Sequence, residues 1–174
     1  LAGVANADLA QNGCPGDSDG DSIRDDQDAC PEIKGPKDQD PKKNGCPKMV
    51  RFVGAELVIL QQVQFTTGTA KLTGNSDEIL TEVATVLKDH PELIKLEVQG
   101  HTDNRGQAAR NRSLSQRRAA RVVAYLVEHG IEAGRLTARG FGPDQPIESN
   151  ASPEGRARNR RVEFHIVEGP GASR

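Results

Sequence analysis

The sequence predicts an α/β fold, an α+β sandwich with a βαβαββ order of elements, in which one mixed sheet carries two long helices on one face. Short apolar or alternating runs indicate strands, and longer runs with apolar residues three and four apart indicate helices. These runs alternate along the second part of the 174-residue chain, which favours helices packed on a sheet. An irregular segment rich in Asp and Cys-Pro precedes them.

The elements follow from their residues in order. The strand at 55–65 is rich in Val, Ile and Leu and leads into a turn-rich loop at 66–74. Asn75 or Ser76 can cap the helix that follows, and Pro91 ends it. The strand at 93–101 alternates apolar and polar residues, as a half-buried strand does.

A second, longer helix is predicted over 108–129, with an apolar stripe that includes Ala119 and Val123. Short strands are predicted at 135–142 and 161–168. Four strands and two long helices provide enough apolar surface for a core. The residues that we expect to be buried in it are Val83, Leu87, Val98, Val122 and Leu126.

Charge divides the chain into parts. Residues 1–47 carry ten acidic and five basic side chains, whereas residues 48–174 carry fifteen acidic and eighteen basic ones. The net charge of −2 gives no overall attraction to nucleic acid, and no run approaches the roughly 18–20 apolar residues that span a bilayer. The predicted parts are a linker or processing remnant (1–13), an Asp-rich spacer (14–47), a folded domain (48–170) and a tail (171–174).

The first residues leave the processing of the chain open. The chain starts at Leu1 rather than Met, so we expect a fragment or a processed chain. Ala5-Asn6-Ala7 is compatible with the end of a signal peptide and equally with a plain linker.

The Asp-rich spacer has too few apolar residues to bury a core. Its stretch "DSDGDSIRDDQD" spaces oxygen donors as positions 1, 3, 5, 7, 9 and 12 of an EF-hand loop, which lets a curled loop aim them at one Ca²⁺. The predicted ligands are Asp17, Asp19, Asp21, the backbone carbonyl of Ile23, Asp25 and Asp28. Two departures are Ser22 at the position of the usual Gly and Asp28 in place of the longer Glu. The alternative is a solvated, disordered acidic linker.

This spacer resembles the thrombospondin type 3 repeat, in which Asp-rich calcium loops alternate with Cys-Pro. The second loop keeps only Asp38 and Asp40 and is interpreted as a half site. Cys14, Cys30 and Cys46 are each followed by Pro and lie sixteen residues apart. Three cysteines cannot all pair within one chain, and the spacing does not choose between Cys14–Cys30 and Cys30–Cys46.

The stretch "GHTDNRGQAARNRSLSQRRAARVVAYL" places a carboxylate and a guanidinium at one junction. Asp103 follows the carboxyl end of a strand, where ligands bind in open α/β folds. Arg118 lies at the edge of the apolar stripe of the following helix. Taken singly, Asp103 is explained as a turn residue or a helix cap, and Arg118 as a side chain that lays its stem across the core. Together they suit the ammonium and carboxylate of an amino-acid head.

With "RGFGPDQPIESN" and "GRARNRRVEF", the same stretch resembles the OmpA-like C-terminal domain, over roughly residues 52–167. That domain also occurs in the peptidoglycan-associated lipoprotein and in flagellar stator subunits. The resemblance implies non-covalent binding of peptidoglycan through the free zwitterionic end of diaminopimelate, held by Asp103 and Arg118. It also implies auxiliary roles for Thr102, Asn104, Asn111, Phe65, Thr66, Asn159 and Arg160. Many members have an acidic residue at the place of Thr66, and Asn159 and Arg160 are either pocket wall or structural support.

An enzyme needs a nucleophile, a base or a metal, and His101 beside Asp103 has no second base or oxyanion motif with it. Nucleic-acid binding lacks stacking aromatics. We therefore expect no enzyme, no nucleic-acid partner and no cofactor in the folded domain. The prediction is a periplasmic anchor of a Gram-negative outer membrane, joined by a Ca²⁺-stiffened spacer to an upstream element and compatible with a weak dimer. The alternative is a calcium-dependent surface or adhesion protein that uses the fold as a scaffold.

Overall fold

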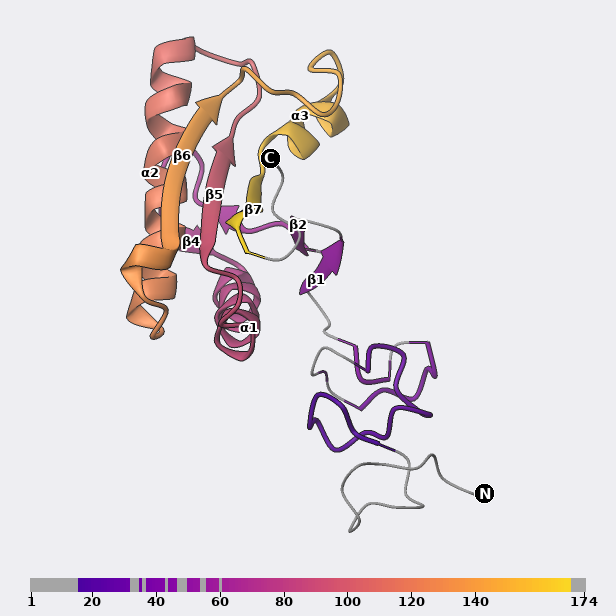
Figure 1. Cartoon of the computed structure of the whole chain (residues 1–174). Coiled ribbons are helices and arrows are strands. Elements are labelled where there is room, and N and C mark those ends of the chain that lie inside the picture. The colour runs from indigo at the N-terminus through magenta and orange to yellow at the C-terminus, as the bar shows by residue number, and fades with distance from the viewer. Residues whose placement is uncertain are drawn as a thin grey trace. The chain divides into compact units, whose positions relative to one another are not determined.

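The computed structural model describes residues 16–31, 35, 37–42, 44–46, 50–53, 56–59 and 61–169. The chain forms two compact units, residues 1–48 and residues 49–174. Figure 1 shows the elements of the second unit, with α2 lying along β5 and β6. Within the described residues, no helix combines the length and the apolar character that crossing a bilayer requires.

The second unit is built on a five-stranded mixed sheet with the order β1-β2-β7-β5-β6. Among the strand pairs of this sheet that the structure describes, only β5 and β6 run parallel, because the helix between them returns the chain to the same end of the sheet. The strands are β1 (Val50–Val53), β2 (Glu56–Ile59), β5 (Lys95–His101), β6 (Leu136–Gly142) and β7 (Val162–Glu168). A separate two-stranded sheet pairs β3 (Gln64–Phe65) with β4 (Leu72–Thr73). This architecture confirms the predicted α/β class.

Two long helices, α1 (Ser76–Asp89) and α2 (Ala108–Glu128), cover the sheet and share one apolar core with it. The hydroxyl of Tyr125 on α2 donates to the carbonyl of Asp77 on α1 at 3.0 Å. The five core residues predicted from helical and strand periodicity have at most 1% of their surface exposed: Val83, Leu87, Val98, Val122 and Leu126. The core prediction is therefore confirmed.

Two glycines set the distance between α2 and the sheet. A Cβ at Gly100 on β5 would overlap the main chain of Ser115, and one at Gly140 on β6 would overlap the main chain of Gln116. The helix can approach the parallel strands this closely only because both positions lack a side chain. This close packing fixes the distance between α2 and the sheet. It thereby also fixes the position of Arg118, which α2 carries.

The last strand of the sheet, β6, is covered along its open edge by a side chain from α2. The Gln116 amide donates to the carbonyl of Ala138 at 3.1 Å, and its oxygen accepts from the N–H of Gly140 at 2.8 Å. Gln116 thus takes the place of a neighbouring strand for two backbone groups of the edge.

The structure differs from the local predictions at several places. The strand expected at 55–65 is two strands, β2 and β3, which belong to different sheets. Strand β1 pairs with β2 but had not been predicted. A further helix, α3 (Pro153–Asn159), precedes β7 and was also missed, as was the short 3₁₀ turn η1 (Ala133–Arg135) before β6. Asn75 occupies the N-cap position of α1 without a capping side-chain bond.

The first unit contains no helix or strand among the residues described there. Its carboxylates bond instead to backbone N–H groups, as when Asp17 accepts from Gly20 at 2.8 Å and from Ser22 at 3.0 Å. Cys30 and Cys46 form a disulfide, which decides between the two pairings left open by the sequence. Cys14, together with the segments 1–13 and 171–174, lies outside the described residues.

Candidate functional site

A cavity of about 700 Å³ opens where β5 ends, between the loop after β5, the first half of α2, α3 and the β3–β4 hairpin. The hairpin is held against the start of α1 by buried Ser76, whose hydroxyl accepts from the N–H of Gln64 at 2.7 Å and donates to the carbonyl of Thr73 at 2.7 Å. The described residues that line the cavity are Gln62, Val63, Gln64, Phe65, Thr67, Gly68, Thr73, Thr102, Asp103, Arg105, Asn111, Leu114, Arg118, Ala157 and Arg160.

Asp103 supplies the only carboxylate among these described lining residues. Its Oδ1 accepts from the backbone N–H of Arg105 at 3.0 Å, and its Oδ2 accepts from Arg160 Nη1 at 2.7 Å. The Asp103 side chain is 13% exposed and that of Arg160 47% exposed. The ion pair therefore sits at a solvent-reachable rim, where a ligand can compete for either partner.

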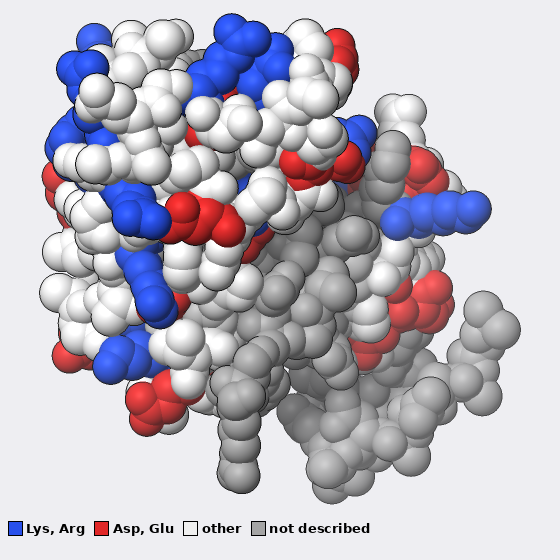
Figure 2. Space-filling view, turned by 90° about the horizontal axis from the view of Figure 1, so that it is seen from above, with Lys and Arg blue, Asp and Glu red and all other residues white. Residues whose placement is uncertain are grey.

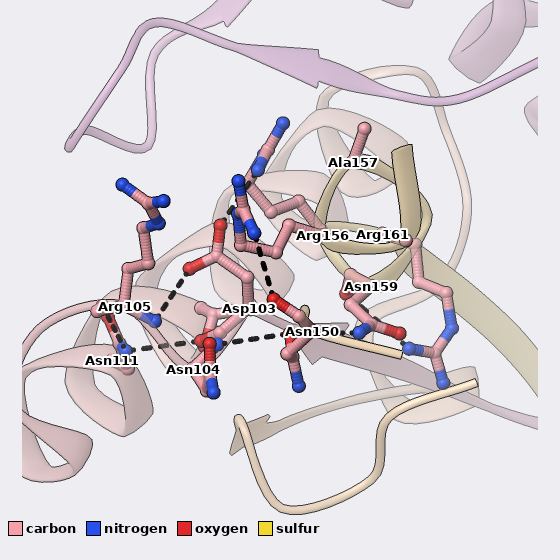
Figure 3. Close-up of polar contacts among 12 residues, drawn as sticks. Asp103, Asn104, Arg105, Asn111, Asn150, Arg156, Ala157, Asn159 and Arg161 are labelled. Carbon is pink, nitrogen blue, oxygen red and sulfur yellow. Dashed lines mark hydrogen bonds and ion pairs between the residues drawn. The ribbon is translucent and has the colours of Figure 1, made fainter. Parts of the chain in front are cut away.

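The loop that carries Asp103 is held by hydrogen bonds between side chains and the backbone of the loop. Figure 3 shows these bonds around Asp103, Asn104 and Arg105. The amide of Asn111, on the first turn of α2, donates to the carbonyls of Asp103 at 3.3 Å and of Arg105 at 2.9 Å. Thr102 donates its N–H to Gly142 and its hydroxyl to the carbonyl of Asp103, each at 2.9 Å. Thr102 and Asn111 thus both line the cavity and hold the carboxylate in place.

Arg118 reaches the same cavity from α2. Its Nε donates to the carbonyl of Thr69 at 2.9 Å, and its guanidinium lies 4.8 Å from the centre of the Phe65 ring, a cation–π arrangement. Burial lowers the pKa of Arg118, the nearby charge of Arg160 lowers it further, and Asp103 raises it. The guanidinium is thus oriented and partly desolvated before any ligand arrives, which strengthens its attraction for an anion.

Three of the residues implied by the resemblance do not line the cavity. Asn159 is fully buried, and its side chain accepts from the N–H groups of Ile147 and Glu148 and donates to Asn150, so it supports the loop before α3. The backbone N–H of Asn104 donates to that same Asn150 side chain at 3.3 Å (Figure 3). Thr66 is exposed and bonds through its backbone to Lys71. The sequence left open whether Asn159 and Arg160 line the pocket or support it. In the structure, Asn159 supports the neighbouring loop and Arg160 lines the cavity.

His101 lies beneath the Asp103 loop. It is 1% exposed, stacks on Phe141 with ring centroids 5.3 Å apart, and has no hydrogen bond on either ring nitrogen. Burial lowers its pKa to about 4, with the charge of Arg161 adding to the shift and that of Glu163 opposing it. His101 is therefore neutral at neutral pH and packs as part of the loop's foundation.

Several lining residues were not anticipated from the sequence. Gln64 and Thr73 come from a hairpin that was not predicted, and Gln62 lies just before it. Ala157 comes from the missed helix α3. A signal for α3 was present in "SPEGRARN", because Ser152 caps the helix by accepting from Gly155 and Pro153 follows at its first position. Arg105, to which no role was assigned, also lines the cavity.

In the first unit, carboxylate oxygens of Asp17, Asp19 and Asp21 lie within 4.8 Å of one another. The predicted ligand Asp25 instead accepts from the N–H and hydroxyl of Ser18, each at 2.8 Å, and Asp28 accepts from the N–H of Cys30 at 2.7 Å. Burial raises the pKa of Asp19, although its backbone bond to Asp21 lowers it, and the charges of Asp21, Asp28 and Asp17 raise it further.

The described lining residues include no His, Cys, Ser or Lys. The cavity presents one carboxylate and three guanidinium groups around a concave surface that also has an aromatic ring and several aliphatic side chains. In Figure 2, Lys and Arg atoms are spread over the face seen from above, with Asp and Glu atoms between them. Such a site can hold an ammonium at Asp103 and a carboxylate at Arg118.

The chain is similar to a known family and to several named proteins. The family model described as "OmpA family" matches residues 64–160. The chain is 39% identical over 151 residues to outer membrane porin F of Pseudomonas aeruginosa, covering 86% of this chain and 41% of the relative. It is 45% identical over 89 residues to the peptidoglycan-binding protein ArfA of Mycobacterium tuberculosis, covering 51% of this chain and 27% of the relative.

A solved structure with the same fold is the cell wall anchor of the T6SS from Pseudomonas aeruginosa. It has a TM-score of 0.53 and 36% identity, with 60% of this chain and 74% of that chain covered. The chain spans less than half the length of the two curated relatives. Because the family model covers more than half of the chain and includes both Asp103 and Arg118, the chain belongs to the OmpA family.

Proposed function

We propose that the second unit binds peptidoglycan non-covalently and anchors an outer-membrane protein to the cell wall. One observation carries the proposal: Asp103 and Arg118, which come from different elements, line the same cavity with opposite charges. The ligand would be the side-chain end of diaminopimelate in the stem peptide, because its free ammonium and carboxylate match these two groups. The names of the relatives support the wall-anchor function over a calcium-dependent scaffold.

The Asp103–Arg160 ion pair indicates how a zwitterion would enter. The ligand's ammonium would share or take over the Oδ2 atom that now accepts from Arg160 at 2.7 Å. Its carboxylate would meet Arg118, which Thr69 and Phe65 hold in position. Binding would break the Asp103–Arg160 ion pair and form two others, one at Asp103 and one at Arg118. The loss of the first pair costs little, because ion pairs that water can reach contribute little to stability. Many weak sites acting on one polymer would then give firm attachment.

Co-sedimentation with purified, protein-free sacculi tests the proposal. The wild type should pellet, whereas Asp103→Ala and Arg118→Ala should stay in the supernatant with unchanged folding. Asp144→Ala and Arg117→Ala are matched controls, because each removes the same charge type from a residue that does not line the cavity. Normal pelleting of Asp103→Ala would sink the zwitterion mechanism, and failure of the folded wild type to pellet would sink wall binding itself.

For the first unit we propose Ca²⁺ binding, which would stiffen a spacer between the anchor and an upstream outer-membrane element in the periplasm. The Oδ2 atoms of Asp19 and Asp28 are buried and have no hydrogen-bond partner among the described residues. The negative charges of neighbouring carboxylates also act on Asp19, and a bound cation would offset them. Hard oxygen donors crowded in this way are the ligands that Ca²⁺ prefers. Asp17, Asp19 and Asp21 would form the centre of the site, with the Ile23 carbonyl, Asp25 and Asp28 completing it.

Limited proteolysis tests the calcium proposal. Ca²⁺ should slow cleavage within residues 14–47 and leave cleavage of the second unit unchanged. Asp19→Asn should abolish this protection, whereas Asp26→Asn, which only breaks an exposed ion pair with Arg24, should retain it. Equal cleavage of the wild type in Ca²⁺ and in chelator would refute the calcium site.

A further inference from the structure

The charges that line the cavity do not match a ligand that offers only one zwitterionic end. Among the described lining residues, the ionisable groups are Asp103, Arg105, Arg118 and Arg160, three cations against one anion. A bound zwitterion adds one charge of each sign and leaves that excess unchanged. The positive charges already oppose one another in the free protein, since Arg160 depresses the pKa of Arg118.

Each guanidinium is in a different situation. Arg160 is paired with Asp103, and Arg118 is held by Thr69 and Phe65. The guanidinium of Arg105, in contrast, has no hydrogen-bonding or ion-pairing partner in the part of the chain that the structure describes. Only the backbone of Arg105 is engaged, by the Asp103 carboxylate and the Asn111 amide. Figure 3 shows its side chain extending from the Asp103 loop with no contact drawn to the guanidinium.

The backbone contacts of Arg105 hold the base of its side chain in place. Its N–H is bonded to Asp103 Oδ1 and its carbonyl to Asn111, so its Cα cannot move without disturbing the carboxylate that is proposed to bind the ligand. The cavity of about 700 Å³ lies within the range of about 300–1,000 Å³ that encloses whole small molecules. It therefore has room for more of the ligand than one amino-acid end.

We infer that the ligand brings a second carboxylate, which Arg105 binds, so that the cavity selects stem peptides whose carboxylates are free over peptides in which they are amidated. This inference rests on the proposed function and adds a specificity-determining residue to it. When the ligand's ammonium occupies Asp103, the second carboxylate offsets the excess positive charge of the rim. A guanidinium recognises a free carboxylate through two parallel N–H bonds, which an amide cannot accept in the same way.

The test is isothermal titration calorimetry of the whole chain with two synthetic stem peptides that contain diaminopimelate. One peptide has all its carboxylates free. The other keeps the free zwitterionic side-chain end of diaminopimelate, and its remaining carboxylates are amides. The wild type should bind the free acid about tenfold more tightly than the amide, the effect of about one charge-assisted hydrogen bond.

The deciding variant is Arg105→Gln, which keeps the backbone bonds to Asp103 and Asn111 and removes only the guanidinium. It should weaken binding of the free acid about tenfold, leave binding of the amide unchanged, and so abolish the preference. Arg110→Gln removes the same charge from an arginine that does not line the cavity and should leave the preference intact.

The outcomes separate this inference from the proposed function. If the wild type binds both peptides equally, or if Arg105→Gln weakens both equally, the inference is wrong while wall binding stands. If the folded wild type binds neither peptide and does not pellet with sacculi, the proposed function has failed and the inference fails with it.

Discussion

The two units of the chain are ordered by different forces. In the second unit, the sheet and the helices α1 and α2 enclose residues such as Leu126 and Phe164, which are at most 1% exposed. In the first unit, Ile23 is the one buried apolar side chain among the described residues, and the loops are ordered by carboxylates bonded to backbone N–H groups and by one disulfide. The stability of an apolar core therefore depends little on the salt concentration or on which cation is present. The stability of loops held by carboxylates depends on both.

The largest expected effect is a loss of core packing in the second unit alone. Leu126→Ala should lower the free energy of unfolding of that unit by about 2–5 kcal/mol, because Leu126 is fully buried and the cavity left behind cannot collapse completely. Chemical denaturation followed by circular dichroism measures the change. Proteolysis within residues 14–47 should proceed at the wild-type rate. A parallel acceleration there would show that the two units share their stability.

The converse change removes the covalent closure of the first unit. Replacing both Cys30 and Cys46 by Ser should destabilise that unit by about 3 kcal/mol, since the disulfide closes a loop of sixteen residues. The rate of limited proteolysis with Ca²⁺ present is the measurement. The thermal midpoint of the second unit is the internal control and should not move. Unchanged resistance of residues 14–47 would mean that their carboxylate bonds suffice without the disulfide.

Acid should weaken the second unit through His101. Its pKa is about 4 in the folded protein against an ordinary value of 6.5, so between these two pH values the unfolded chain binds a proton that the folded chain does not. The free energy of unfolding should fall by up to about 1.4 kcal/mol per pH unit as the pH drops from 6.5 towards 4. This contribution is fully present above pH 6.5.

Equilibrium unfolding at a series of pH values measures this slope. The charged groups that face His101 are Glu163, Arg161 and His165. The hydrogen bond to His165, and then the contacts with Arg161, lower the pKa of Glu163 from 4.5 to about 2. Its own contribution to the free energy of unfolding is therefore lost as the pH falls from 4.5 towards 2. His101→Gln should flatten the slope between pH 6.5 and 4, and His129→Gln should leave it steep. An equally steep slope in His101→Gln would assign the acid sensitivity elsewhere.

The smallest expected effect concerns one strained residue of the first unit. Ser22 has a φ of 71°, the only positive φ of a non-glycine residue among those the structure describes. In the calcium loop that we propose for this segment, it occupies the place of the usual Gly. Ser22→Gly should stabilise the loop by about 1 kcal/mol by removing the Cβ. Slower proteolysis of the variant checks this. Ser22→Ala keeps the strain and should show no gain.

The spacing of apolar residues along the sequence predicted the features that depend on local pattern, above all which residues are buried. The core residues Val83, Leu87 and Val98 are buried as expected, because a helix or strand of known phase has only one face to bury. The division of 55–65 between β2 and β3 was missed, since two apolar runs separated by Gln61 and Gln62 look continuous until the pairing partner of each is known. Pairing is a property of the whole sheet and has no signal inside one strand.

The site was predictable in its two central residues and less so in their surroundings. The structure places Asp103 and Arg118 on one cavity, as the family resemblance implied. That Asp103 already has a partner could not be foreseen, because Arg160 follows it by 57 residues and meets it only through the packing of the missed helix α3. Arg105 was passed over because a cation in a loop has no periodic or motif signature of its own.

The Gln116 side chain that covers the edge of β6 has a consequence for crowding. A wall-bound protein would stand among many identical copies, and an open edge strand offers each copy a template for the next. Two backbone groups of that edge, on Ala138 and Gly140, are already satisfied within the chain. A neighbouring copy that added a strand there would first have to break both bonds. The helix that carries Arg118 therefore also protects this edge of the sheet against addition of a further strand.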